Sequence, residues 1–406
     1  MISQGNQEIN NSYSFKFYKF ILPVYFPLLL LSICIGILAP AIPAKVNWIG
    51  GSVFLIGLIV GARNLGEAVF AVPVGIIINK LGTRITTITG SIGVSFFALI
   101  AGLSPNGYIL YFSIFFLGAS LGLFGISRHS YLSKVVPIDY RGKAFSRFGG
   151  VSRIGYFIGP LIGGFSAKYI NFDIPFYLVF VISAMATLLM YFISSPEEKY
   201  LIQENKNTSK KVTQIIKENK YSLGVVGTGL FILNLLRESR HIIIPLWAFN
   251  IGLEVDALGI IQSISSAIDM TLFYPAGYVM DKFGRKWTSV PSIILLSLAF
   301  SLISFADSYQ KLLLVGLILG ISNGIGSGAM LTLGSDLAPE DSNGPFLGIW
   351  RLISWSGSGL ASPLVGTIGQ FLSLSLASFS ITGIGFIGIV FFVFLVPETL
   401  RKNHNP

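Results

Sequence analysis

Ionisable side chains inside strongly apolar stretches are the residues of this sequence most able to do chemistry. Glu67 and Asp269 each lie near the middle of such a stretch, and Asp269 stands 202 positions after Glu67. A low-dielectric surrounding favours the neutral form of a carboxyl group, so both side chains are candidates to take up and release protons. Arg63 precedes Glu67 by one helical turn, and an ion pair between them would instead keep the glutamate ionised.

A second set of such residues is mostly basic. An ionisable group that faces lipid at membrane depth costs at least about 2.5 kcal/mol, so we expect these groups to face a cavity or one another. The residues predicted to line a substrate cavity are Arg63, Arg128, His129, Arg153, Arg237, Glu238, Arg240 and His241. Arginine binds carboxylate or phosphate through two hydrogen bonds, although a structural ion pair explains the same residues. The excess of arginine favours anionic or zwitterionic ligands, while the 33 phenylalanines would also serve amphipathic ones.

Enzyme chemistry is not indicated. The sequence has three histidines, and His404 lies in the C-terminal tail, so His129 and His241 are too few for a metal site. Gly383, Gly385 and Gly388 have dinucleotide-binding spacing, but they lie in an apolar stretch with no strand before it. We therefore expect no catalytic residue, no metal and no cofactor.

Membrane-spanning helices must position these side chains. Of 406 residues, 52% are hydrophobic and 11% are charged, which is too little charge for the surface of a soluble protein. The sequence predicts an all-α protein of the lipid bilayer with twelve transmembrane helices in two bundles of six. The predicted spans are 20–41, 51–78, 86–103, 108–133, 144–168, 175–194, 222–248, 256–279, 287–305, 311–336, 345–370 and 376–396.

The basic residues outside the spans predict the orientation. Of the 28 lysines and arginines, nineteen lie in segments that are cytoplasmic if the N-terminus is inside, three lie on the other side, and six are arginines within spans. The positive-inside rule therefore places both termini in the cytoplasm of a multi-pass protein, which we expect in a prokaryotic plasma membrane. It also explains the net charge of +10 without nucleic acid as a partner.

The second half repeats the first at an offset of 202 residues. Gly57 corresponds to Gly259, Pro73 to Pro275, and Gly118 to Gly320. Tandem copies with an even number of spans have the same orientation, so an axis along the membrane normal relates them. We predict an N-terminal bundle at 1–194, a polar cytoplasmic linker at 195–220 and a C-terminal bundle at 221–406.

The loop after the second span of each half carries glycine, three residues, an Asp or Asn, a basic residue and a second glycine. The two copies comprise Gly75, Asn79, Lys80, Gly82 and Arg84, and Gly277, Asp281, Lys282, Gly284, Arg285 and Lys286. This pattern resembles the loop signature of the major facilitator superfamily, although Asn79 replaces the usual Asp. We expect the loops to serve gating, with Gly75 and Gly277 packing helices closely and Gly82 and Gly284 making the turns.

The fifth span contains a ladder of small residues: Gly155, Gly159, Pro160, Gly163 and Gly164. The ladder resembles the antiporter-associated motif of the same superfamily, which implies an exporter, although close helix packing explains the same residues. The resemblance also implies that the first and seventh spans line a central cavity.

Together these features predict a secondary active transporter with alternating access, functional as a monomer. The leading prediction is proton-coupled antiport that exports small organic molecules such as drugs or metabolites. The main alternative is proton-coupled uptake of an organic anion or zwitterion by symport. A channel or a non-transporting receptor is the alternative outside this class.

Overall fold

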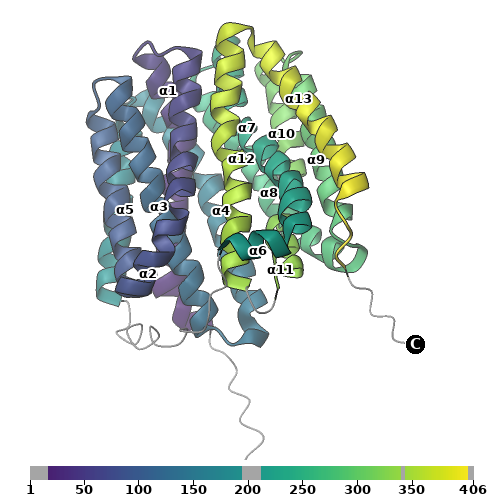
Figure 1. Ribbon diagram of the computed structural model, residues 1–406. Helices are drawn as coiled ribbons and strands as arrows, with labels where there is room; N and C mark the ends of the chain where they lie inside the picture. The colour runs from purple at the N-terminus through teal and green to yellow at the C-terminus, as the bar shows by residue number, and fades with distance from the viewer. Residues whose placement is uncertain (1–16, 194–211, 340–342, 401–406) are drawn as a thin grey trace, which may run out of the picture.

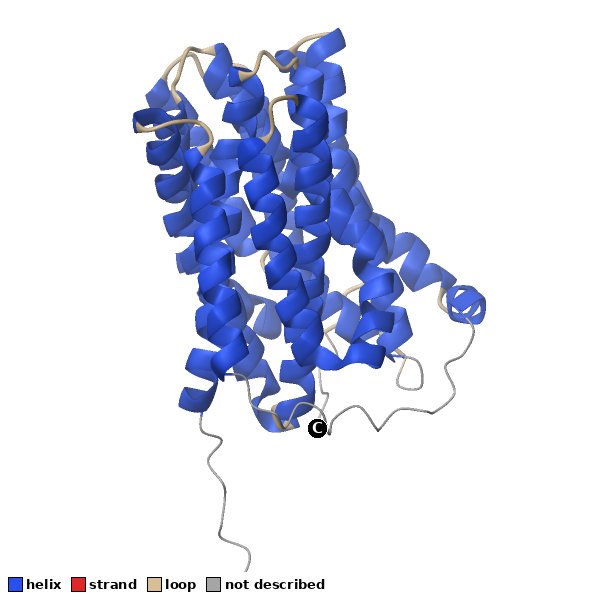
Figure 2. Ribbon diagram, turned by 90° about the vertical axis from the view of Figure 1, so that its left-hand side faces the viewer, coloured by secondary structure: helices blue, strands red, loops and turns tan. Residues whose placement is uncertain are grey.

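The computed structural model describes residues 17–193, 212–339 and 343–400, and every regular element in these ranges is helical. Most of the linker predicted at 195–220 lies outside the described residues. The helices run between two ends of the molecule, and the connections lie at those ends (Figure 2). The first described element lies at the end predicted to be cytoplasmic, and the chain that follows the last element runs toward the same end (Figure 1).

The first half begins with two short helical turns, η1 (Phe17–Phe20) and η2 (Ile21–Tyr25). Its long helices are α1 (Phe26–Trp48), α2 (Val53–Leu103), α3 (Gly107–Val135), α4 (Ile138–Tyr169) and α5 (Ile174–Ile193). The helix α2 contains two spans, because Gly82 turns the chain between them with a φ of 82°. A side chain would be strained at this angle, so glycine serves the turn that the sequence predicts.

The second half contains the short α6 (Val212–Glu218) and the turn η4 (Ser222–Val226) before its first span. The spans are formed by α7 (Gly227–Asn250), α8 (Val255–Phe283), α9 (Lys286–Ile303), α10 (Tyr309–Ile325) with α11 (Ala329–Leu337), α12 (Asn343–Phe371), and α13 (Leu374–Val390) with η5 (Phe391–Leu395). The tenth span was predicted as one helix. It is broken between α10 and α11, where Gly328 has a φ of 90°.

In the described part of the chain the helices form twelve spans in two six-helix halves, as predicted. Within the described residues, nine helical segments are long and apolar enough to cross a membrane by length and composition alone. The other three spans are α4, α7 and α12, whose apolar character is diluted by glycine, serine and charged residues. Such helices need protein neighbours rather than lipid around them.

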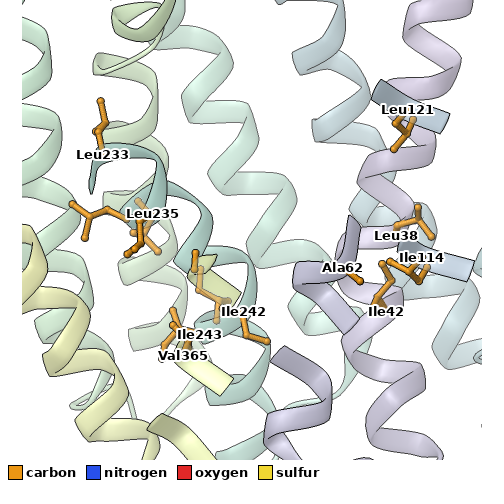
Figure 3. Packing of buried hydrophobic residues seen from close by; sticks show 14 of the residues in the cluster. Leu38, Ile42, Ala62, Ile114, Leu121, Leu233, Leu235, Ile242, Ile243 and Val365 are labelled. Atoms are coloured by element: carbon orange, nitrogen blue, oxygen red, sulfur yellow. The ribbon is translucent and has the colours of Figure 1, made fainter. Parts of the chain in front are cut away.

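Apolar packing builds a core within each half. In Figure 3, Leu38, Ile42, Ala62 and Ile114 gather on one side of the view, while Ile242, Ile243 and Val365 gather on the other. Small residues also bring helix backbones close together within a half. A Cβ on Gly159 of α4 would lie 2.5 Å from the Cα of Gly36 in α1, so nothing larger than glycine fits there.

The two halves contact each other near the end predicted to be external. There α2 packs on α12 and α4 packs on α8. A Cβ on Gly57 would lie 2.8 Å from the Cα of Gly366, and one on Gly164 would lie 3.2 Å from the Cα of Gly259. At the opposite end, the sites of a Cβ on Gly75 and Gly277 have no atom within 4 Å. The close packing expected from these two glycines is therefore not present in this conformation.

Candidate functional site

A cavity of about 230 Å³ lies between the two halves. Its wall is built by α1, α2 and α4 from the first half and by α7 and α8 from the second. The α1 side is apolar, with Ile35, Leu38 and Ala39, whereas α7 contributes charged and polar groups. The ionisable and uncharged polar residues of the lining are Arg63, Tyr156, Glu238, Arg240, His241, Gln262, Ser265, Ser266 and Asp269.

Arg63 of α2 joins the two halves at this wall. Its guanidinium Nη2 lies 3.4 Å from Oε1 of Glu238 in α7, and its Nη1 lies 3.9 Å from Oε1 of Glu67 one turn along α2. The pair predicted between Arg63 and Glu67 is thus the longer of two ion pairs that share one arginine. The shorter pair crosses from one half to the other.

A second cross-half pair joins Arg153 of α4 to Asp269 of α8. Their Nε and Oδ1 atoms are 3.5 Å apart, and Nε makes no hydrogen bond in the described chain, so the contact is an ion pair only. Asp269 also accepts hydrogen bonds from Asn323 Nδ2 at 2.9 Å and Ser327 Oγ at 3.3 Å. The Arg153 guanidinium lies 3.9 Å from the centre of the Phe273 ring. Asp269 is therefore held by both halves.

The structure divides the residues predicted for the cavity and for proton coupling into three groups. Arg63, Glu238, Arg240 and His241 line it, as does Asp269. Glu67 and Arg153 stand behind the lining, each paired with a lining residue. The remaining three, Arg128, His129 and Arg237, lie outside it.

Packing explains where these three point. Arg128 is 2% exposed and lies over the Tyr131 ring. The His129 ring stacks on Phe145 of α4, with ring centres 5.2 Å apart. Arg237 donates from Nη2 to the Asn323 carbonyl oxygen of α10 at 3.0 Å.

The sequence model of the Major Facilitator Superfamily matches residues 24–236 and, as a second copy, residues 226–406. The chain belongs to this superfamily. Among curated relatives, an uncharacterized MFS-type transporter of Methanocaldococcus jannaschii is 21% identical over 84% of this chain and 89% of its own. The class H tetracycline resistance protein of Pasteurella multocida is 22% identical over 86% and 87%. The cis,cis-muconate transport protein of Acinetobacter baylyi is 23% identical over 77% and 78%.

A solved D-xylose-proton symporter has the same fold, with a TM-score of 0.75 and 16% identity over 94% of this chain and 99% of its own. As a superfamily member, the chain is a transporter of small molecules and an integral multi-pass membrane protein, not an enzyme.

Uncharged polar residues complete the site of this superfamily transporter, and the sequence reasoning missed them. Gln262 lines the cavity, and Asn323 and Ser327 hold Asp269. One signal was available for Gln262, since it precedes Asp269 by seven residues and so shares its helix face. Asn323 and Ser327 gave no comparable signal, because Asn and Ser among glycines are common in membrane helices.

The two signature loops lie at the end predicted to be cytoplasmic. Arg84 donates to the Tyr191 carbonyl oxygen at 3.0 Å, and Lys286 donates to the Val393 carbonyl oxygen at 2.9 Å. Asn79, Lys80, Asp281 and Lys282 are exposed. Gly284 has a φ of 118°, so it makes the same turn as Gly82.

The small-residue ladder of α4 packs on two neighbours. Gly155, Gly159 and Gly163 contact α1, while Gly164 contacts α8 of the other half. Pro160 reaches both, since its ring lies near Gly36 and its carbonyl oxygen lies near Gly259. Every residue of the ladder therefore contacts a neighbouring helix.

Proposed function

We propose that this transporter is a proton-coupled antiporter that exports small organic molecules by alternating access. The observation that carries the proposal is the pair of cross-half contacts beside the cavity, Arg63 with Glu238 and Arg153 with Asp269. In each pair the first half supplies the cation and the second half supplies the carboxylate. We also propose that one chain suffices, because its own two halves build the cavity, and that both termini lie in the cytoplasm of a prokaryote.

Protonation gives these pairs a way to couple transport to a gradient. A neutral carboxyl group on Asp269 no longer attracts the Arg153 guanidinium, so the free energy needed to separate α4 from α8 falls. Glu67 competes with Glu238 for Arg63, and a proton on either changes which pair is made. Glu67 and Asp269 are therefore proposed as the proton-coupling residues.

Export is supported by two further observations. The α4 ladder resembles an antiporter-associated motif, and it lies where α4 meets both α1 and α8. A transporter that confers resistance acts most simply by removing the toxic compound, and one relative is a tetracycline resistance protein.

Uptake of an organic anion or zwitterion by proton symport is the second candidate. It is favoured by Arg240, which lines the cavity and makes no ion pair with a described carboxylate. A relative is a cis,cis-muconate transport protein. A proton that neutralises Asp269 would leave an arginine free for the substrate, so anion and proton would bind together.

Flux measurements in proteoliposomes distinguish the two candidates. The purified chain is reconstituted, a pH gradient is imposed, and cationic, zwitterionic and anionic compounds are screened while internal pH is recorded. Proton movement opposite to the substrate supports antiport. Movement of both in one direction contradicts it and supports symport, and gradient-independent conduction contradicts both.

Neutral variants test the coupling residues. Glu67→Gln and Asp269→Asn are expected to reduce gradient-driven flux at least about tenfold, while substrate exchange without a gradient persists. Asp307→Asn is the control, because Asp307 is an exposed residue whose ion-pair partner, Lys311, is one helical turn away. Unchanged gradient-driven flux in the Asp269 variant would remove that residue from the coupling step.

A further inference from the structure

Arg240 is the cavity-lining arginine that makes no ion pair with a described carboxylate, and Asp269 and Glu238 attract its charge only from a longer distance. Its Nε donates to Nε2 of His241 at 3.3 Å, and no carboxylate in the described part of the chain lies within ion-pair distance of it. Its two terminal nitrogens make no hydrogen bond to a described residue, and they are not among the buried atoms that lack a partner. The forked end of the guanidinium is therefore open to the cavity.

The surrounding charges leave a positive excess. The cluster contains four arginines, Arg63, Arg153, Arg237 and Arg240, and three carboxylates, Glu67, Glu238 and Asp269. Each carboxylate has an ion-pair partner among these arginines. Protonation of a carboxylate makes the cluster more positive, so the excess persists in either protonation state.

Gln262 is a second unpartnered polar group on the same wall. The residue is 8% exposed, and its Oε1 and Nε2 are both buried and have no hydrogen-bond partner among the described residues. A buried amide left without a partner destabilises the protein, so a group of this kind at a cavity wall points to a polar ligand.

We propose that the cavity binds small organic monoanions, with the terminal nitrogens of Arg240 donating to a carboxylate and the Gln262 amide hydrogen-bonding a second polar group. This inference rests on the proposed function in taking the cavity as the transport site. One net positive charge matches one carboxylate, and the planar fork of arginine binds a carboxylate through two parallel hydrogen bonds. The cavity of about 230 Å³ is below the range of roughly 300–1,000 Å³ typical of drug-sized ligands, which favours a metabolite-sized molecule.

Three probes of one shape and different charge test this inference. Benzoate, benzamide and benzylamine are titrated by calorimetry at millimolar concentration into the full chain in detergent, without any gradient. Benzoate is expected to bind at least about tenfold more tightly than benzamide, because a hydrogen bond to a charged group is stronger than a neutral one. Tighter binding of benzamide or benzylamine, or no binding of benzoate, would overturn the inference.

Variants locate the subsite. Arg240→Gln is expected to weaken benzoate binding about 10- to 100-fold without weakening benzamide, and Arg240→Lys is expected to recover part of the loss, because lysine keeps the charge without the fork. Arg351→Gln is the matched control, since Arg351 lies in a span but outside the cavity lining. Equal benzoate affinity in Arg240→Gln and in the unchanged protein would contradict the proposal.

Gln262→Leu separates a ligand-binding role from a structural one. If the amide binds a second polar group of the ligand, this variant weakens the binding of 4-hydroxybenzoate severalfold and leaves that of benzoate, which has no second polar group, nearly unchanged. It also raises the melting temperature of the ligand-free protein, because the unpartnered amide is gone. A lower melting temperature would assign Gln262 to the structure instead. Because binding in detergent needs no gradient, a protein that prefers benzoate but shows no proton-driven flux contradicts only the proposed coupling. Proton-driven flux without benzoate preference contradicts only the anion subsite.

Discussion

The α4–α8 and α2–α12 interfaces join the two halves at positions related by the repeat. A Cβ on Gly259 would lie 2.5 Å from the Pro160 carbonyl oxygen, and one on Gly57 would lie 2.6 Å from the Ser362 carbonyl oxygen. Gly259 and Ser362 stand 202 residues after Gly57 and Pro160. The 202-residue offset therefore also relates the contacts between the halves, and a glycine approaches a carbonyl oxygen in the same way at both helix crossings.

The two interfaces differ in charge. At the α4–α8 interface, Lys168 Nζ lies 2.7 Å from Glu254 and 2.8 Å from Asp256. At the repeat-related place, Gln370 Oε1 accepts a hydrogen bond of 3.5 Å from the Phe54 backbone N–H. Close backbone packing is thus common to the two interfaces. The ion pairs of Lys168 are a feature of the α4–α8 interface. We therefore expect the glycines to serve the motion proposed for both interfaces, and the charges of the α4–α8 interface to shift the balance between conformations.

The largest expected effect comes from filling the glycine crossings. Gly57→Val and Gly259→Val place atoms where a carbonyl oxygen stands, and such overpacking costs typically about 1–3 kcal/mol. The population of the conformation that is closed at the predicted external end should therefore fall about 10- to 100-fold in both variants. Transport by reconstituted protein should fall with it, to a similar extent in each.

Gly383→Val controls for helix propensity, because the Cβ site of Gly383 in α13 has no atom within 4 Å. Transport by this variant should stay within about twofold of the unchanged protein, since exposed substitutions have small effects. If Gly57→Val were tolerated while Gly259→Val abolished transport, the two crossings would not be equivalent.

Helix number and the repeat were predictable from the sequence because they depend on composition along the chain. The break at Gly328 was not predicted, since hydropathy does not register a backbone angle. The height of a residue in the membrane also follows from the rise per residue, so Glu67, twelve residues before Asn79 of the first signature loop, is expected about 18 Å from that loop. The direction of a side chain around the helix axis does not follow from this rise. Packing with neighbouring residues turns Arg128 and His129 away from the cavity that Arg240 lines.

A smaller effect is expected from removing the ion pairs that Lys168 makes with Glu254 and Asp256. Lys168→Gln makes the α4–α8 interface resemble the α2–α12 interface, and exposed ion pairs contribute about 0–1 kcal/mol. The balance between conformations should therefore shift no more than about fivefold toward the one open at the predicted external end.

Spin labels at the exposed residues Tyr108 and Phe305, in a Cys34→Ala background, report this shift as a change in interlabel distances. The difference between Lys168→Gln and the unchanged protein should shrink at high salt, because salt screens exposed charges. Gln370→Leu is the matched change at the neutral interface, and a larger shift in that variant would contradict the assignment of the bias to Lys168.

The two signature loops differ in the same way as the two interfaces: contacts to backbone carbonyl groups occur in both loops, and the second loop adds an ion pair. Arg84 and Lys286 occupy repeat-related positions, and so do the carbonyl groups of Tyr191 and Val393 to which they donate. Only the second loop has Arg285, which pairs with Asp336 at 2.9 Å, where the first loop has Thr83. Glu398 adds to this loop by accepting the backbone N–H groups of Arg285 at 2.8 Å and Lys286 at 3.0 Å.

The smallest effect concerns Glu398 and pH. Partial burial raises the pKa of this carboxyl group, but the backbone N–H groups that bind it outweigh burial and hold the pKa below its usual value. A carboxylate with a lowered pKa stabilises the folded state above the pKa of the unfolded chain, and that contribution is lost as pH falls through the folded value. Glu398→Gln should thus lower the melting temperature near neutral pH by no more than about 2 °C, and the difference should vanish in acid. Asp281→Asn, in the same loop but with a side chain 76% exposed, is the control, and near neutral pH it should lower the melting temperature less than Glu398→Gln does. A Glu398→Gln difference that persists below the pKa of the carboxyl group would mean that packing of the side chain, and not its charge, holds the second loop.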